Sequence, residues 1–178
     1  LDAQGNDIND QSSFNILSVQ SRLKGSISGP DAFGAKTSGV IEADFFGNAN
    51  SNINMLRLRH AFIKLNWEHS ELLLGQYWNP MFQTDCYPTT LSFNSGAGIM
   101  PFARNPQLRY TYKSGGFKFI ATAFTERDYR SNGIDCSTSE CLRNSGIPAL
   151  NGQIHYMYKN DNVTLITGLG AGYMNIIP

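Results

Sequence analysis

Charged and polar side chains recur at every second position in three neighbouring segments of the N-terminal half of the chain. They are Gln20, Arg22 and Lys24 in the first segment, Glu42 and Asp44 in the second, and Arg57 and Arg59 in the third. In an extended strand, alternate side chains point to the same face, and neighbouring strands lie about 4.8 Å apart. Such rows of opposite charge can interact from strand to strand.

Two interpretations of these rows are open. One is a water-filled lumen whose charged wall orients and selects ions, as the charged rings of selectivity filters do. The other is the solvated face of a soluble sheet, where exposed ion pairs contribute little to stability. The first interpretation adds Arg109 and Lys113, from a later segment, to the residues that would line the pore.

Catalytic patterns are weak. Glu42 and Asp44 share one face, as an acid and base pair would, but any two lumen carboxylates at this spacing would do the same. The chain has no nucleophile-elbow serine, phosphate-binding loop or HExxH sequence. We therefore expect no enzyme and no cofactor.

The three cysteines, Cys86, Cys136 and Cys141, lie in polar segments rich in Pro, Gly, Ser and Asn. Cys136 and Cys141 are near enough in sequence to close a small disulfide loop in an oxidising compartment, which would leave Cys86 free or paired elsewhere. Zinc sites need about four ligands at characteristic spacing, and the three histidines lie far from the cysteines in sequence. No metal site is expected.

The composition is that of a neutral, strand-rich protein. The 178 residues include 14 basic and 14 acidic side chains, so nucleic acid, which attracts strongly basic proteins, is not an expected partner. Glycine (17) and aromatic residues (11 Phe, 8 Tyr and 2 Trp) favour strands and turns over a helical bundle. No apolar run approaches the roughly 18 residues of a membrane helix.

Apolar and polar residues alternate with a period of two along eight segments, which indicates strands. The expected strands are 14–27, 35–46, 52–67, 70–78, 105–113, 116–126, 149–159 and 162–175. Most are about nine to fourteen residues long, longer than the about five or six residues of an ordinary strand and long enough for the about nine to eleven that cross a bilayer at a tilt. In the third, the apolar parity changes between Leu58 and Ile63, which indicates a bulge near His60 or burial of both faces.

The connections between these strands alternate between short and long. The short ones are Glu68-His69-Ser70, Ser114-Gly115 and Asn160-Asp161, and the long ones span 79–104 and 127–148. Bacterial outer-membrane barrels have short periplasmic turns and long extracellular loops. The parity further predicts strands before Leu1 and after Pro178, so residues 1–178 are expected to be part of one larger barrel domain.

Aromatic residues lie near several strand ends, where they would form an interfacial girdle or fill a core. These residues are Trp67, Tyr77, Trp78, Phe124 and Tyr129. Gly168, Gly170 and Gly172 share one face and would leave room for a bulky neighbour, a bend or a loop folded into the pore. The segment 79–104 is the candidate for that loop.

The stretch 21–82 resembles the large Gram-negative outer-membrane porins, especially the porin-like group that includes dicarboxylate-uptake channels. The similar pieces, in the order of consecutive porin strands, are Ser21-Arg22-Leu23, Ile41-Glu42-Ala43-Asp44-Phe45-Phe46-Gly47, Leu56-Arg57-Leu58-Arg59-His60-Ala61 and Leu74-Gly75-Gln76-Tyr77-Trp78. The likeness covers about a third of the chain. The departure is size, because eight strands cannot close a barrel of that width.

The resemblance implies an all-β fold, an antiparallel transmembrane barrel of about 16 or more strands to which this chain contributes about eight. It implies diffusion of small hydrophilic solutes or ions through a water-filled channel in the outer membrane of a Gram-negative bacterium, often as a homotrimer. The expected partners are the lipid bilayer and small polar solutes. By this likeness Arg22, Glu42, Asp44, Arg57 and Arg59 line the pore.

Two alternatives stand beside the channel. A soluble β-sandwich that binds carbohydrate would bury the apolar strand faces in a core and stay soluble without detergent. An outer-membrane barrel enzyme or adhesin would show hydrolysis or ligand binding in its long loops.

Overall fold

Eight antiparallel strands form a single sheet in the computed structural model, which describes residues 1–10, 12, 14, 16, 18–47, 50–87, 102–125, 144–175 and 177. The strands are β1 (Arg22–Ser28), β2 (Lys36–Asp44), β3 (Arg57–Asn66), β4 (Ser70–Trp78), β5 (Arg104–Ser114), β6 (Phe117–Phe124), β7 (Ala149–Lys159) and β8 (Thr164–Tyr173). Two 3-10 turns, η1 (Asn50–Asn52) and η2 (Thr84–Cys86), lie between strands. The all-β antiparallel fold expected from the sequence is confirmed.

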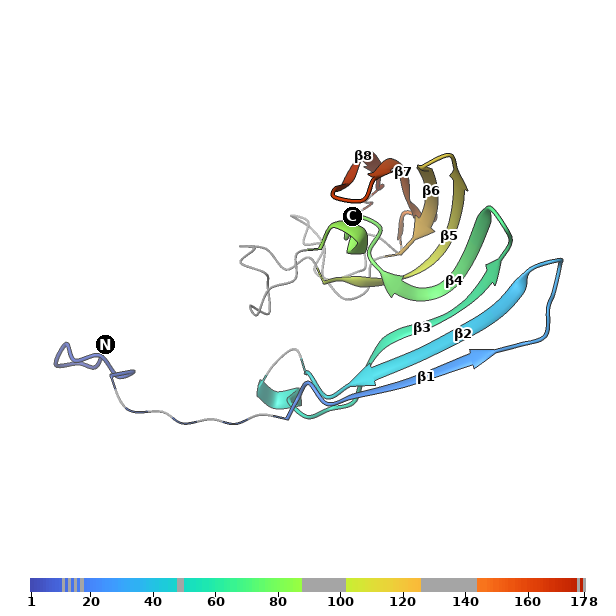
Figure 1. Ribbon diagram of the computed structural model, residues 1–178. Coiled ribbons are helices and arrows are strands. Elements are labelled where there is room, and N and C mark those ends of the chain that lie inside the picture. The colour runs from blue at the N-terminus through green and yellow to red at the C-terminus, as the bar shows by residue number, and fades with distance from the viewer. Residues whose placement is uncertain are drawn as a thin grey trace.

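Each strand pairs with the next along the chain, from β1 to β8. Figure 1 shows the result as one curved layer, with η2 lying inside the curve. Among the described residues, no helix is long and apolar enough to cross a membrane.

The observed strands lie inside the expected ranges or extend past them by one residue at an end, but β1 and β3 begin later than expected, by eight and five residues. The expected strand began at residue 14, but β1 begins at Arg22, which pairs with Asp44, the last residue of β2. None of the described residues before Arg22 pairs with β2. Gln20 lies in a turn ahead of the strand, so its assignment to the strand was wrong.

A bulge in β3 accounts for the change of apolar parity. Glu42 pairs with His60, whereas the next residue of β2, Ala43, pairs with Leu58, so Arg59 has no partner across this ladder. Both Arg59 and His60 are buried. The extra residue thus turns two adjacent polar side chains toward one face, as bulges do.

The two faces of the sheet differ in chemistry. Cross-strand partners share a face, and the registers place the large apolar side chains on what we call the outer face, where they are exposed. They include Leu23, Ile27, Ile41, Leu58, Ile63, Leu74, Leu108, Tyr110, Tyr112, Phe117, Phe119, Leu150, Ile154, Tyr156, Leu165, Leu169 and Tyr173.

The opposite, concave face, called the inner face, carries polar side chains. Its buried members are Glu42, Asp44, Arg59, His60, Asn105, Gln107, Thr111, Thr122, Asn151, Gln153 and His155. An apolar exposed face and a polar buried face invert the arrangement of a soluble sheet, in which apolar side chains lie inside.

The connections are sorted by length between the two ends of the sheet. Those after β1, β3, β5 and β7 span 29–35, 67–69, 115–116 and 160–163, whereas those after β2, β4 and β6 span 45–56, 79–103 and 125–148. In a sheet with this strand order, alternate connections lie at the same end. One end of the sheet therefore has only short turns, as expected.

Candidate pore wall

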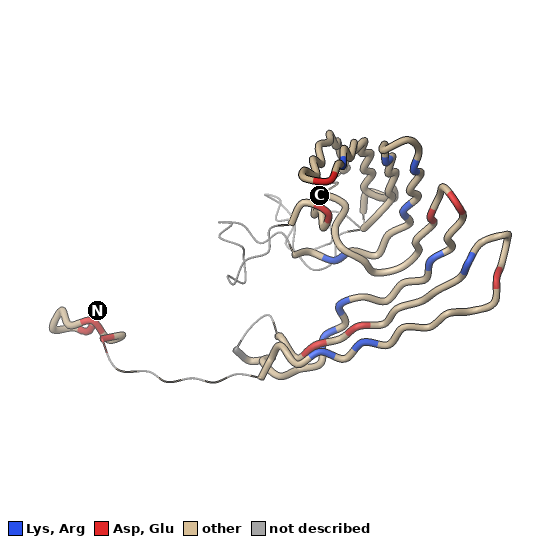
Figure 2. The backbone as a smooth tube through the Cα atoms, viewed as in Figure 1, with Lys and Arg blue, Asp and Glu red and all other residues tan. Residues whose placement is uncertain are grey.

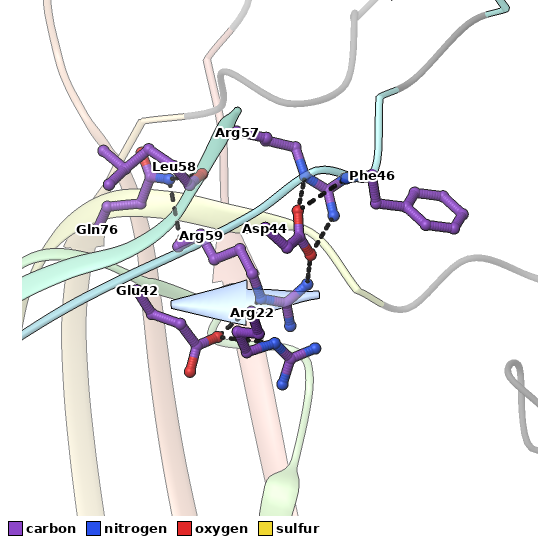
Figure 3. A network of polar contacts seen from close by, with 8 residues as sticks. All are labelled: Arg22, Glu42, Asp44, Phe46, Arg57, Leu58, Arg59 and Gln76. Atoms are coloured by element: carbon purple, nitrogen blue, oxygen red, sulfur yellow. Dashed lines mark hydrogen bonds and ion pairs between the residues drawn. The ribbon is translucent and has the colours of Figure 1, made fainter. Parts of the chain in front are cut away.

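A chain of ion pairs crosses the inner face of β1, β2 and β3 (Figure 3). The guanidinium of Arg59 joins two carboxylates, with Nε 2.7 Å from Oε1 of Glu42 and Nη1 2.7 Å from Oδ2 of Asp44. The bulge places Arg59 between these carboxylates, which lie two residues apart on β2. The rows predicted from alternation therefore meet in one network.

The network extends through two further arginines. Arg57 binds Asp44 in the two-pronged geometry that favours arginine, with Nε 3.1 Å from Oδ1 and Nη2 3.0 Å from Oδ2. Nε of Arg22 lies 3.6 Å from Oε1 of Glu42. Three arginines thus meet two carboxylates, and the balance of the network is positive.

Burial differs sharply along the network. The side chain of Asp44 is 2% exposed, whereas that of Arg22 is 47% exposed. A buried carboxylate is tolerated only when paired and hydrogen-bonded, so Arg57 and Arg59 hold Asp44 in the wall. Arg22 and its neighbour Lys24, which pairs with Glu42 in the β1–β2 register, are the exposed cations at this edge of the sheet.

Aromatic rings pack beside the network at the end of β4. The Trp78 ring lies 5.9 Å from the guanidinium carbon of Arg59 and 4.1 Å from that of Arg104. The His60 ring packs against Trp78, with centroids 5.0 Å apart, and against Tyr77 at 5.4 Å. Cation–π contacts of this kind support the arginine side chains.

Arg109 and Lys113 lie on the inner-face parity of β5, but outside the network. The Arg109 guanidinium lies 5.2 Å from the Tyr77 ring centroid and donates a hydrogen bond to the Trp78 carbonyl at 3.1 Å. Lys113 is exposed near the short-turn end, where it pairs in register with Lys118 of β6. The two residues therefore belong to a different part of the wall from the network on β1 to β3.

Charge is distributed unevenly between the two halves of the sheet (Figure 2). Strands β1 to β4 carry both signs, whereas β5 to β8 carry basic residues and no Asp or Glu. The basic residues of this second half are Arg104, Arg109, Lys113, Lys118 and Lys159.

The segment after β4 folds back over the inner face. We call residues 79–87 the strap. Nε2 of Gln83 donates to Oε1 of Gln153 at 2.8 Å, and Nε2 of Gln153 donates to the Pro80 carbonyl at 2.5 Å. Lys118 and Asp85 also form an ion pair. The first part of the 79–104 segment therefore lies against β6 and β7, inside the curve, and 88–101 lie outside the described residues.

The glycine stripe of β8 faces the same side. A Cβ atom on Gly168 would lie 2.7 Å from Cδ2 of His155, and one on Gly170 would lie 3.0 Å from Cγ of Gln153. The bulky neighbours accommodated by the stripe are thus side chains of β7. A cavity of about 220 Å³ lies between this stripe and the strap residues Met81, Gln83 and Cys86.

The aromatic residues do not all form a girdle. Trp67 follows β3 and donates its Nε1 hydrogen to the Phe33 carbonyl at 2.9 Å, at the short-turn end. Phe124 is buried on the inner-face parity, and Tyr77 packs on His60, so the girdle was the wrong interpretation for these two. Tyr129 lies outside the described residues.

One of the three cysteines lies among the described residues. Cys86 is free and exposed. Cys136 and Cys141 lie outside the described residues, so their disulfide stays a prediction.

Sequence reasoning missed several inner-face residues. Lys64 and Glu71 form an ion pair at 2.8 Å, and Lys118 alternates with Phe117 and Phe119, a pattern that marks it as facing opposite to these rings. Asp85 carried no such signal, because it lies in a connection and meets Lys118 only in the folded wall.

Comparison with known proteins identifies the architecture. No protein-family model matches the chain, and no curated protein matches it. The fold is similar to the crystal structure of the outer membrane channel DcaP of Acinetobacter baumannii, with a TM-score of 0.60 and 26% sequence identity over 80% of this chain. The chain spans 38% of the length of that channel. Its eight-stranded sheet has the fold of a segment of a porin barrel wall.

Proposed function

We propose that this chain forms part of the wall of a water-filled channel in the outer membrane of a Gram-negative bacterium, through which small hydrophilic solutes or ions diffuse. The observation that carries the proposal is the inverted chemistry of the sheet. Apolar side chains are exposed on the outer face, and charged side chains are buried on the inner face.

The outer face suits lipid. Ile27 is 70% exposed and Leu169 is 85% exposed. Contact with acyl chains removes such apolar surface from water and stabilises the protein by about 25 cal/mol per Å². The strand ladders pair backbone groups from strand to strand. Such pairing is required of any strand in the hydrocarbon core, where water is absent.

The inner face suits ions in water. An ion in hydrocarbon loses its hydration at great cost, and a lumen with fixed charges offsets this loss. Arg22 and Lys24 are exposed positive charges on β1, beside the buried carboxylates of the network, and the second half of the wall is basic. A lumen bounded by these groups favours entry of small anions over cations, and electrostatic focusing raises their local concentration.

The soluble sandwich is the less suitable alternative. A sandwich needs a second sheet to cover its apolar face, and the described residues supply one sheet whose apolar face is open. Association into homotrimers, implied by the resemblance, stays a prediction that the native mass in detergent tests.

The test uses the full protein that contains these strands. Extraction from membranes only with detergent, followed by stepwise conductance in a planar bilayer, is the expected result. The same preparation after heat denaturation is the control and conducts no steps. A protein that remains soluble without detergent, or a folded protein that never conducts, contradicts the proposal.

A further inference from the structure

The strap is held to the inner face at two points of different character. The first is the set of amide contacts near its start, in which Gln153 receives a hydrogen bond from Gln83 and donates to the Pro80 carbonyl. Pro80 and Gln153 are both buried. The Pro80 carbonyl also accepts a hydrogen bond from Nε2 of Gln83 at 2.7 Å. Several hydrogen bonds among buried and half-buried groups thus hold this end of the strap to β7, so this anchor is firm.

The second point is the ion pair between Asp85 and Lys118. Their side chains are 37% and 24% exposed. Ion pairs with such access to water contribute little, typically less than about 1 kcal/mol, and salt screens them. The strap therefore has a firm anchor at Gln83 and a weak one at Asp85, two residues further along.

The weak anchor lies in a basic cavity. This cavity has a volume of about 600 Å³, and its charged lining comprises Lys113, Lys118 and Lys159 with Asp85 as the acidic group. His69 and His155 also line it. Nδ1 of His155 is buried and has no hydrogen-bond partner among the described residues. Three lysines and one aspartate thus line the cavity, Lys118 pairs with that aspartate, and the aspartate comes from the strap.

We propose that Asp85 is a built-in anion that occupies this basic cavity and latches the strap to the wall, and that a small oxyanion in the lumen displaces it. The inference rests on the proposed function for its consequence, passage through the channel. Displacement exchanges one ion pair with Lys118 for another, so no covalent step is involved. Gln83 and Gln153 remain in contact, and the strap swings about that anchor.

The latch is tested first without reference to conductance. Cys86 and Ile166 both line the cavity of about 220 Å³ beneath the strap. In folded full-length protein carrying Cys136→Ser, Cys141→Ser and Ile166→Cys, called the parent protein, a short bis-maleimide joins Cys86 to position 166. Adding Asp85→Asn is expected to lower the rate of cross-linking up to about fivefold, the factor that an exposed ion pair of ordinary strength contributes.

Inorganic phosphate is the probe for displacement. Phosphate is expected to slow cross-linking in the parent protein more than sodium chloride of the same ionic strength does, and to have no such additional effect after Lys118→Gln. The matched control is Asp31→Asn, which removes the exposed Lys36–Asp31 pair (2.7 Å) in the turn after β1. This control variant is expected to cross-link at the unaltered rate.

The outcomes separate the latch from the channel. Equal cross-linking in the parent protein and its Asp85→Asn variant overturns the latch, and equal effects of phosphate and chloride overturn its displacement by oxyanions. In bilayers, Asp85→Asn is expected to raise the anion current per channel. A conducting wild-type channel with an unchanged current in the variant overturns the latch alone, whereas a folded protein that never conducts overturns the proposed function.

Discussion

Nη1 of Arg59 lies 2.7 Å from Oδ2 of Asp44, although the two residues would not face each other in a regular ladder. The contact exists because the bulge in β3 leaves Arg59 without a partner on β2 and turns it to the same face as His60. One inserted residue thus converts two separate charged rows into a continuous network that runs from β1 to β3.

The network makes Arg59 a stability residue. We expect Arg59→Gln to reduce the free energy of unfolding by about 3–5 kcal/mol, because it leaves the buried carboxylates of Glu42 and Asp44 with one partner fewer. Unfolding in guanidinium chloride measures this change in free energy. The loss of the compact band in unheated gels reports the unfolded fraction. Arg22→Gln is the control, since its half-exposed pair contributes less than about 1 kcal/mol. Equal losses in the two variants would contradict this account of the network.

The exposed cations of β1 are the positions for altering selectivity. Replacing both Arg22 and Lys24 by Glu is expected to move the ion preference of the channel toward cations, measured as the reversal potential in a salt gradient. Arg57 and Arg59 are less suitable positions for changing the ion preference, because both form ion pairs with Asp44. The control exchanges the same two residues as Arg22→Lys and Lys24→Arg, which conserves charge. An unchanged reversal potential in a conducting Glu variant would remove these residues from the lumen.

The crowding beside the glycine stripe predicts that replacing Gly168 by alanine lowers the stability of the protein. Gly168→Ala places a Cβ atom 2.7 Å from the His155 ring and close to the β7 backbone, and we expect it to cost about 1–3 kcal/mol of stability. Gly152→Ala on β7 is the matched control, because no atom of the described residues, its chain neighbours apart, lies within 4 Å of its added Cβ. The stability of both variants is measured by unfolding in guanidinium chloride. A Gly152 variant as unstable as the Gly168 variant would mean that strand propensity, not crowding, decides the effect.

A substitution on the outer face tests whether this face contacts lipid or water. Leu169 is 85% exposed, so Leu169→Lys would change little in a soluble protein. In a bilayer we expect the same change near the middle of β8 to cost about 2–4 kcal/mol. Folding into lipid vesicles, compared with folding of Leu169→Ala, gives the difference. A Lys variant that folds as well as the Ala variant would place β8 outside the hydrocarbon.

The sequence was sufficient to predict the strands because alternation is a local property. Residues 70–78 and 149–159 were delimited correctly from their pattern alone. The same pattern offered a bulge near His60 as one of two explanations for the change of apolar parity, and the bulge lies at Arg59, the residue before it.

Other features depended on register and on distant contacts. Gln20 was placed in a strand because its neighbours alternate, but the length of β2 decides where β1 can begin. Phe124, at a strand end, was expected either in an interfacial girdle or in a core, and its pairing with Gln107 places it on the inner face. The contact of Asp85 with Lys118 joins a connection to a strand two strands further along the sheet, and no local pattern encodes it.

The order of pairing has a kinetic consequence. Every ladder joins strands that are neighbours in the chain, so the sheet can grow hairpin by hairpin with little loop entropy lost at each step. The strap is the exception, because Gln83 meets Gln153 across 70 residues. The strap can dock only after β7 has joined the sheet. A probe attached to Cys86 would therefore report a late step in the folding of the wall.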